Sequence, residues 1–271
     1  MDRIQRLQFS DRKSMIKNEL KNAIEKNELY ILYQPQINTL SNEITGIEAL
    51  LRWDNSKLGN VSPVEFIPIA EDLDYIVEIG NWVMDKALRQ ACAWKKKGCK
   101  FNTISINVSP IQINKENFKK NLLSIINKYN IPRNFLEIEI TEGTIIDINK
   151  EKIDMLTEIM NSGISIALDD FGTGYSSLSY LINIPVNTLK IDKIFIGNIN
   201  SDKSKILIEG IVSLSKSLKY KIIAEGVETK EQLDLLTSIG CNIIQGFYFS
   251  EPLSESEMEN LLKINGGVNN I

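Results

Sequence analysis

Three short stretches decide the fold: TISINVS at Thr103–Ser109, FLEIEITE at Phe135–Glu142 and SIALDD at Ser165–Asp170. In each of them apolar and polar residues alternate with a period of two, which is the pattern of a β-strand. The stretch Phe118–Tyr129 between the first two has apolar residues at helical spacing and is followed by Pro132. Strands that alternate with helices indicate βαβ units and a parallel sheet.

The same alternation continues in both directions along the chain. Apolar stripes at helical spacing cover residues 79–94 and 206–218. Five further strand-like runs lie at Tyr30–Pro35, Ile44–Trp53, Thr188–Asp192, Lys221–Gly226 and Asn242–Phe249. Eight strands interleaved with helices predict an α/β fold of the (β/α)8 barrel type.

One connection is too short for this pattern. Only the residues from Gln36 to Glu43 separate the first two strands, whereas a parallel crossover needs about a dozen residues or more. We therefore expect a hairpin, with the first strand antiparallel to its neighbour. The segment Asn55–Leu73 is longer than a simple loop and predicts a small lobe or an extra helix.

The barrel is expected to occupy residues 20–264. Residues 1–28 are charged and partly amphipathic, which predicts an N-terminal helical lead-in or linker. Residues 265–271 are interpreted as a flexible tail.

Composition excludes several classes of chemistry. The 271 residues include no histidine, so Ser-His-Asp and Cys-His nucleophile pairs and His-ligated zinc are ruled out. The three cysteines fit no metal or redox spacing and indicate a reducing, cytoplasmic compartment. There is no apolar stretch of membrane-spanning length and no signal-peptide core. A net charge of −4 argues against long nucleic acid as a partner.

The polar residues of the strands share a position that a purely structural barrel does not need. In Thr103–Ser109, for example, the apolar residues occupy one face, and Ser105 and Asn107 occupy the other. If the apolar face meets the helices, the polar face lines the barrel near the carboxyl ends of the strands, where barrel active sites are built. The acidic residues that converge there are Glu48, Glu139, Asp169 and Asp170. Divalent cations would offset their repulsion, and all-oxygen ligands favour Mg²⁺ or Mn²⁺.

The chain resembles the EAL-domain family, a group of cyclic di-GMP phosphodiesterases, over nearly its whole length. The signature Glu48-Ala49-Leu50 alone carries little weight, but eight blocks follow one another in order. They are Tyr33–Pro35, Glu48–Trp53, Ser105–Ser109, Glu139–Glu142, Asp169–Leu178, Leu189–Asp192, Ala224–Glu228 and Gln245–Phe247. Departures from the family pattern fall at Gln36, Phe247 and Glu251.

The resemblance implies a reaction and a set of site residues. The reaction is hydrolysis of cyclic di-GMP to linear pGpG by a water molecule held between two Mg²⁺ or Mn²⁺ ions. The implied metal ligands are Glu48, Asn107, Glu139, Asp169 and Asp170. The implied catalytic residues are Lys190, Glu225 and Glu48. The implied substrate contacts are Gln34, Leu51, Arg52 and Gln245. The implied loop-positioning residues are Glu142, Asp192 and Glu228.

Two questions about mechanism and regulation stay open at this point. A lysine beside two cations is expected to have a depressed pKa, so Lys190 acts either as the base or as an oriented donor, with Glu225 as the rival base. The resemblance also implies a homodimer, in which the loop within Asp169–Leu178 joins the interface. A regulatory domain or partner is compatible with the sequence, which shows no sensor pattern of its own.

Two other functions compete with the leading one. A catalytically silent cyclic di-GMP receptor would signal by binding alone, but it is expected to lack part of the metal-ligand set. An unrelated magnesium-dependent barrel enzyme would act on phosphorylated or carboxylate metabolites. Because all eight blocks are present, we expect an active phosphodiesterase.

Overall fold

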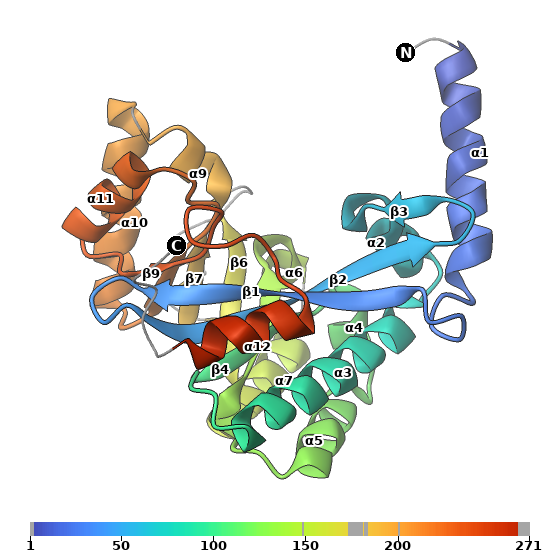
Figure 1. Ribbon diagram of the computed structural model, residues 1–271, viewed down its shortest axis with the longest axis horizontal. Coiled ribbons are helices and arrows are strands. Elements are labelled where there is room, and N and C mark those ends of the chain that lie inside the picture. Colours follow the sequence, from blue (N-terminus) through green and yellow to red (C-terminus); the bar gives the residue numbers. More distant parts are fainter. Residues whose placement is uncertain (1–2, 148, 173–180, 182–183, 200, 265–271) are drawn as a thin grey trace.

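The chain folds into a closed barrel of eight strands with helices around it (Figure 1). The computed structural model describes residues 3–147, 149–172, 181, 184–199 and 201–264. The barrel strands are β1 (Leu29–Asn38), β2 (Glu43–Asn55), β4 (Thr103–Asn107), β5 (Leu136–Thr141), β6 (Ser165–Phe171), β7 (Thr188–Ile191), β8 (Lys221–Ala224) and β9 (Ile243–Ile244). Because β1 pairs with both β2 and β9, the sheet closes on itself. The predicted (β/α)8-type barrel is confirmed.

The first strand is antiparallel, as the short connection predicted. β1 pairs with β2 in an antiparallel register that sets Gln34 opposite Glu48 and Gln36 opposite Gly46. It is also antiparallel to β9, whereas the remaining barrel pairs, from β2–β4 round to β8–β9, are parallel. The register of the hairpin shifts between Gln36 and Ile37, because Thr45 of β2 is an extra residue between their partners Gly46 and Ile44.

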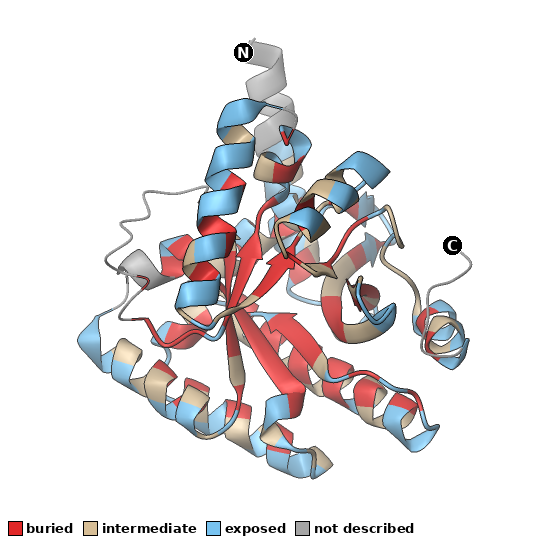
Figure 2. Cartoon of the chain, turned by 90° about the vertical axis from the view of Figure 1, so that its left-hand side faces the viewer, coloured by how far each residue is buried: buried red, intermediate tan, exposed pale blue. Residues whose placement is uncertain are grey.

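The helices pack their apolar stripes against the barrel, so that buried residues face inward and exposed residues outward (Figure 2). Those that follow the predicted stripes are α3 (Ile76–Lys96), α5 (Phe118–Tyr129) and α10 (Asp202–Ser217). The others in the described residues are α1 (Arg3–Leu20), α2 (Pro63–Asp72), α4 (Pro110–Asn114), α6 (Glu142–Asp147), α7 (Lys150–Asn161), α9 (Lys193–Gly197), α11 (Lys230–Ser238) and α12 (Glu255–Lys263), with a 3-10 turn at Arg133–Phe135.

The lobe predicted for Asn55–Leu73 is present. It consists of the short strand β3 (Gly59–Val61), which pairs with the end of β2, and helix α2. Figure 1 shows the hairpin of β1 and β2 reaching from the barrel into this lobe. Trp53 of β2 is fully buried there and packs edge-on against Phe66 of α2.

Helix α1 joins the lobe. The Arg12 guanidinium donates to both carboxylate oxygens of Glu65 on α2, and Ile16 and Leu20 belong to the buried core. The boundary between a lead-in of residues 1–28 and the barrel domain stays a prediction, and the tail 265–271 lies outside the described residues. Among the helices that the structure describes, none combines the length and apolar character that a membrane crossing requires.

The eighth strand is much shorter than the alternation predicted. Only Ile243 and Ile244 of the expected Asn242–Phe249 run form strand β9. A Cβ atom on Gly246 would lie 2.2 Å from the carbonyl oxygen of Val227, so the two backbones are in close contact. The chain then turns, because the N–H of Tyr248 donates to Val227 and the N–H of Phe249 donates to the carbonyl of Gly246.

Packing of α3 against the hairpin generates a stability prediction. Trp94 is fully buried, and its ring lies edge-on to Tyr33 with 4.8 Å between centroids. Trp94→Ala should lower the free energy of unfolding by about 3–5 kcal/mol, because it leaves a large cavity. Urea unfolding followed by circular dichroism measures this loss. Trp82→Ala, a change to a half-buried tryptophan of the same helix, is the matched control, and equal losses in both variants would contradict the packing account.

Candidate functional site: a carboxylate cluster around Lys190

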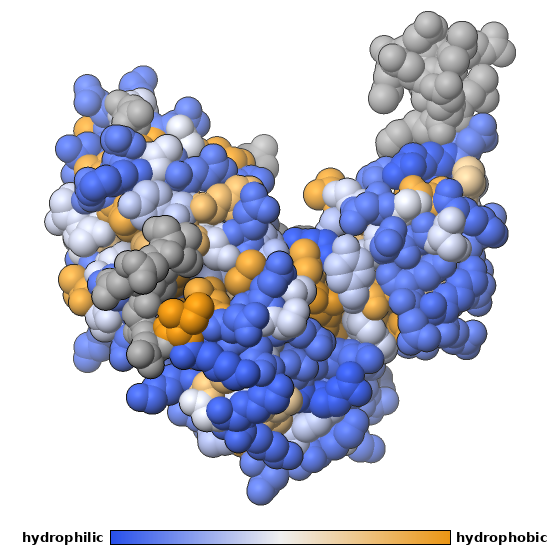
Figure 3. All heavy atoms as spheres, in the orientation of Figure 1, coloured by the Kyte–Doolittle hydropathy of each residue, from blue (hydrophilic) through white to orange (hydrophobic). Residues whose placement is uncertain are grey.

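The site lies over the carboxyl ends of the barrel strands. β2 leads into the lobe of β3 and α2, and β7 leads into α9. Figure 3 shows the molecule hollowed between that lobe and the helices α9 to α11. The polar residues that the alternation turned toward the barrel interior therefore lie beneath an open face.

Lys190 is at the centre of these residues. Its side chain is 1% exposed, and its Nζ lies 2.6 Å from Glu139 Oε2 and 2.6 Å from Glu225 Oε1. Asp169 Oδ1 lies 3.3 Å from the same atom, and Glu48 Oε2 lies 3.4 Å away. These four carboxylates come from strands β2, β5 and β6 and from the turn after β8, so the closed barrel brings them together around one ammonium group.

The charges in this cluster shift one another's pKa strongly. Burial acts to lower the pKa of Lys190, but Asp169, Glu139, Glu225 and Glu48 together raise it well above its ordinary value. The carboxylates therefore keep Lys190 protonated. Burial and the charge of Glu48 raise the pKa of Glu139 well above its ordinary value.

Glu48 responds in the opposite direction. Burial acts to raise its pKa, but Lys190 and the hydrogen bonds from Gln245 and Asn107 outweigh this effect and lower it. Asn107 Nδ2 donates to Glu48 Oε1 at 2.7 Å, and Gln245 Nε2 donates to Glu48 Oε2 at 2.5 Å. Glu48 is therefore the carboxylate that the surrounding donors hold in its ionised form.

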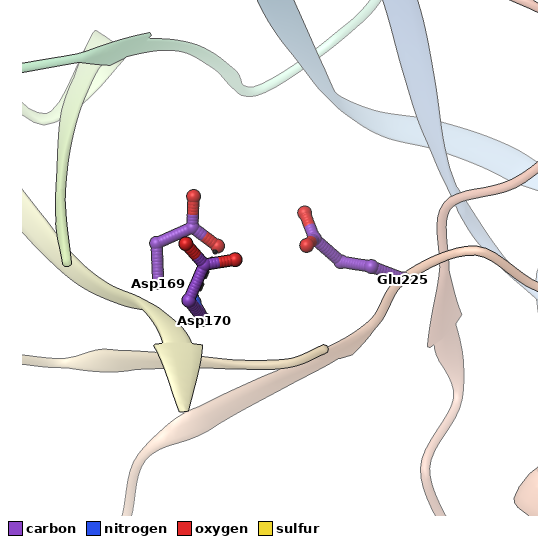
Figure 4. Close-up of side chains that lie close together, drawn as sticks. All are labelled: Asp169, Asp170 and Glu225. Atoms are coloured by element: carbon purple, nitrogen blue, oxygen red, sulfur yellow. Dashed lines mark hydrogen bonds between the residues drawn. The ribbon is translucent and has the colours of Figure 1, made fainter. Parts of the chain in front are cut away.

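A second group of carboxylates lies beside the first. Oxygen atoms of Asp169, Asp170 and Glu225 all lie within 4.8 Å of one another. Figure 4 shows the two aspartates side by side at the end of β6, with Glu225 directed toward them. Asp170 has a φ of 54°, a left-handed conformation that is uncommon for residues other than glycine and is found at functional sites. This backbone turn places both consecutive side chains on the same side.

The second group is also shifted toward protonation. Burial and the charges of Asp169 and Asp192 raise the pKa of Asp170 to about 6. Burial raises the pKa of Glu225 to about 8; Lys190 opposes this rise, whereas Asp169 and Glu48 add to it. Carboxylates that retain protons near neutral pH lack sufficient compensating positive charge.

The residues fit divalent metal ions of the hard, oxygen-preferring type. Five carboxylates face a single lysine, and Glu139 Oε1 is buried with no hydrogen-bond partner among the described residues. Carboxylates and an amide oxygen are the ligands that Mg²⁺ and Mn²⁺ prefer. The predicted ligands Glu48, Asn107, Glu139, Asp169 and Asp170 are thus brought to one place, and the chemistry of this donor set suits such an ion.

Two of the predicted substrate contacts are buried beneath the mouth of the site. Gln245 Nε2 donates to Gln34 Oε1 at 3.0 Å as well as to Glu48, and Gln34 Nε2 donates to the carbonyl of Ser250 at 3.1 Å. The other two lie further along β2. Arg52 is half-buried and donates to the carbonyl of Leu51, which is also partly exposed.

The predicted loop-positioning residues have different environments. Glu142 is buried, and its Oε2 accepts from the N–H of Gly172 at 2.9 Å. Asp192 caps α9 by accepting from the N–H of Ile194 at 2.7 Å. Glu228 is exposed, and its N–H donates to Gln232. The part of the Asp169–Leu178 block from residue 173 onward lies outside the described residues, as does the predicted dimer contact within it.

Sequence reasoning missed one residue in this network. Gln36 is fully buried, and its Nε2 lies 3.2 Å from Gln245 Oε1. The family resemblance marks Gln36 only as a departure from the pattern. The signal that could have identified it is its parity with Gln34, because residues two apart on a strand face the same side.

Comparison with known proteins agrees with this site. The family model described as "EAL domain" matches residues 17–252. The oxygen sensor protein DosP of Escherichia coli (strain K12) is 38% identical over 240 residues, which are 88% of this chain and 30% of DosP. The cyclic di-GMP phosphodiesterase PdeR of the same organism is 34% identical over 245 residues, which are 90% of this chain and 37% of PdeR. The chain thus spans about a third of the length of these curated relatives.

A solved structure is also similar to this chain in sequence and in fold. The phosphodiesterase PaMucR, in a complex with c-di-GMP, matches with a TM-score of 0.85 at 35% sequence identity, over 90% of this chain and 99% of that chain. By sequence, by fold and by its cluster of acidic residues, the chain belongs to the EAL domain family.

Proposed function

We propose that this chain is a metal-dependent phosphodiesterase that hydrolyses cyclic di-GMP to linear pGpG. The observation that carries the proposal is the convergence of five carboxylates and Asn107 around Lys190 at the mouth of an EAL-family barrel. Support comes from relatives such as PdeR, which is named a cyclic di-GMP phosphodiesterase, and from PaMucR, whose structure holds c-di-GMP.

The proposed metal ligands divide into two overlapping sets. Glu48, Asn107, Glu139 and Asp169 would hold one Mg²⁺ or Mn²⁺ ion, and Asp169 and Asp170 would hold a second with Glu225 close by. Such ions, when bound, lower the pKa of a water molecule and stabilise the negative charge that develops on the phosphate oxygens.

The protein's own groups would position the reactants and move one proton. Lys190 is an ammonium group held by four carboxylates, so it acts as an oriented donor rather than as a base. Glu225, whose Oε1 lies 2.6 Å from Lys190 Nζ, would then be the carboxylate that takes the proton of the attacking water once bound cations have lowered its pKa. Arg52 offers its planar guanidinium to a phosphate group of the substrate.

Other features of the proposal concern the setting of the domain. Since the relatives are about three times longer than the match, we propose that this domain acts beside a regulatory domain or partner. Homodimerisation and a cytoplasmic location are further predictions from the family resemblance and the composition.

The first prediction is the reaction itself. Purified chain incubated with cyclic di-GMP and Mg²⁺ or Mn²⁺ should form pGpG, and EDTA should prevent it because the carboxylates alone cannot activate water. Chromatography of the products measures the conversion. Binding of the nucleotide without conversion in either metal would favour a receptor that signals by binding, and neither binding nor conversion would contradict the proposal.

A second prediction separates metal binding from positioning. Glu48→Ala, Asn107→Ala and Asp169→Ala should each reduce turnover by about 100-fold or more and weaken Mn²⁺ binding, because they remove ligands. Lys190→Met should reduce turnover but keep nucleotide affinity close to that of the unsubstituted chain. Isothermal titration with Mn²⁺ and with nucleotide measures both affinities, and circular dichroism checks the fold. Turnover in Glu48→Ala equal to that of the unsubstituted chain would refute the metal assignment.

A third prediction follows from the raised pKa of Glu225. In the metal-free chain, Glu225 keeps its proton up to about pH 8, whereas the unfolded chain releases it near pH 4.5. A rise in pH between these values therefore favours the unfolded state, and the free energy of unfolding should fall. Urea titrations at a series of pH values measure this slope. Glu225→Gln should flatten it, and the same slope in that variant would show that Glu225 is not its source.

A further inference from the structure

We propose that Gln36 is a positioning residue for the metal site: it fixes the amide of Gln245 so that Gln245 donates to Glu48. The proposal rests on the function proposed above, since it assigns a role in preparing Glu48 to bind a cation. Gln36 lies one residue beyond the Tyr33–Pro35 block. Its Nε2 hydrogen-bonds to Ser105 and Gln245, neither of which is a proposed metal ligand. Gln36 therefore acts on the metal site through Gln245.

The orientation of the Gln245 amide follows from its partners. Its Nε2 lies 2.5 Å from Glu48 Oε2 and 3.0 Å from Gln34 Oε1. An ionised carboxylate is an acceptor only, so the atom facing Glu48 has to be the amide nitrogen. Both of its hydrogens are then used, and Gln245 Oε1 needs a donor from another direction. Gln36 Nε2, at 3.2 Å, is that donor.

The backbone holds Gln36 in the required place. The register of the hairpin shifts directly after Gln36, where Thr45 of β2 has no partner on β1, and Thr45 Oγ1 donates to the carbonyl of Gln36. Opposite it is Gly46, where an added Cβ atom would lie 2.3 Å from Gln36 Oε1. A side chain at position 46 would therefore displace the Gln36 amide and, to a lesser degree, the Thr103 hydroxyl, which lies 2.9 Å from the same added atom. The second contact of Gln36 Nε2, at 3.4 Å, is Ser105 Oγ.

Loss of the Gln36 donor would change the preferred state of Gln245. Its Oε1 would become a buried acceptor without a partner, which is unfavourable. Rotation of the amide would relieve that cost but would turn an oxygen toward the Glu48 carboxylate. Either outcome weakens the hydrogen bond that holds Glu48 Oε2 in place. The hydrogen bond from Gln36 therefore favours the orientation of the Gln245 amide in which its nitrogen faces Glu48.

The test uses two variants of the full chain and one matched control. Gln36→Met keeps the length of the side chain and removes the amide, whereas Gly46→Ala keeps the amide and displaces it. Gln112→Met is the control, because Gln112 is also buried and also packs against a glycine, Gly80, but lies on α4 outside the barrel. All three variants are compared in unfolding experiments, so that loss of general stability is measured separately.

Three readouts distinguish positioning from a merely structural role. The Mn²⁺ affinity of the nucleotide-free protein should fall about tenfold in Gln36→Met and in Gly46→Ala. This is the smallest loss typical of substitutions that remove a hydrogen-bond partner of a metal ligand. In Gln112→Met the affinity should stay within about twofold of that of the unsubstituted chain. The side-chain NH2 signals of Gln245 in a 1H–15N spectrum, assigned by their absence in Gln245→Met, should shift in the first two variants only. Turnover lost in Gln36→Met should return at excess Mn²⁺.

The outcomes separate this proposal from the function on which it rests. Unchanged Mn²⁺ affinity and unshifted Gln245 signals in Gln36→Met would overturn the role of Gln36, even if the unsubstituted chain hydrolyses cyclic di-GMP. Failure of the unsubstituted chain to hydrolyse it would overturn the proposed function, while the Gln245 signals would still test the amide contact. In a double variant, Gly46→Ala should add little to the loss in Gln36→Met, and full additivity would contradict an effect through Gln36.

Discussion

One constraint governs the carboxyl end of the barrel: four carboxylates share one buried ammonium group. Glu48, Glu139, Asp169 and Glu225 all lie within 3.4 Å of the Lys190 ammonium. Burying several anions beside one cation is energetically unfavourable. The pKa values of Glu139 and Glu225 are raised for this reason, because protonation removes part of the negative charge. Packing of the helices against the apolar outer faces of the strands offsets the repulsion among the carboxylates inside the barrel. The site is therefore stabilised by the rest of the protein.

Much of this arrangement could be predicted from the sequence because it depends on local patterns. The period-two alternation in β4 to β6 assigned both the barrel and its polar interior, and the short connection after β1 required a hairpin. The carboxylates could be assigned to one cavity because the carboxyl ends of parallel strands meet at one end of a barrel.

The remaining features depend on contacts between distant parts of the chain. The alternation after Asn242 gave no sign that the backbone of Val227 lies against Gly246 and limits β9 to two residues. The direction of the pKa shift of Lys190 required the distances of four carboxylates from separate strands. Gln36 was visible in the sequence, but its partner Gln245 lies 209 residues away. The predicted metal ligands were brought together, whereas the amide network beneath them became apparent only in three dimensions.

The antiparallel β1 has a consequence for the order in which the protein folds. Its pairing with β2 joins neighbouring segments and closes a short loop, whereas its pairing with β9 closes a loop of more than 200 residues. Closure of a long loop carries a larger entropic cost, and non-local contacts form slowly. The hairpin is therefore an early unit of the folding process, and the seam between β1 and β9 is a late one. Gln34 and Gln36 lie on one side of that seam and Gln245 on the other, so their amide contacts with Gln245 are assembled only when the barrel shuts.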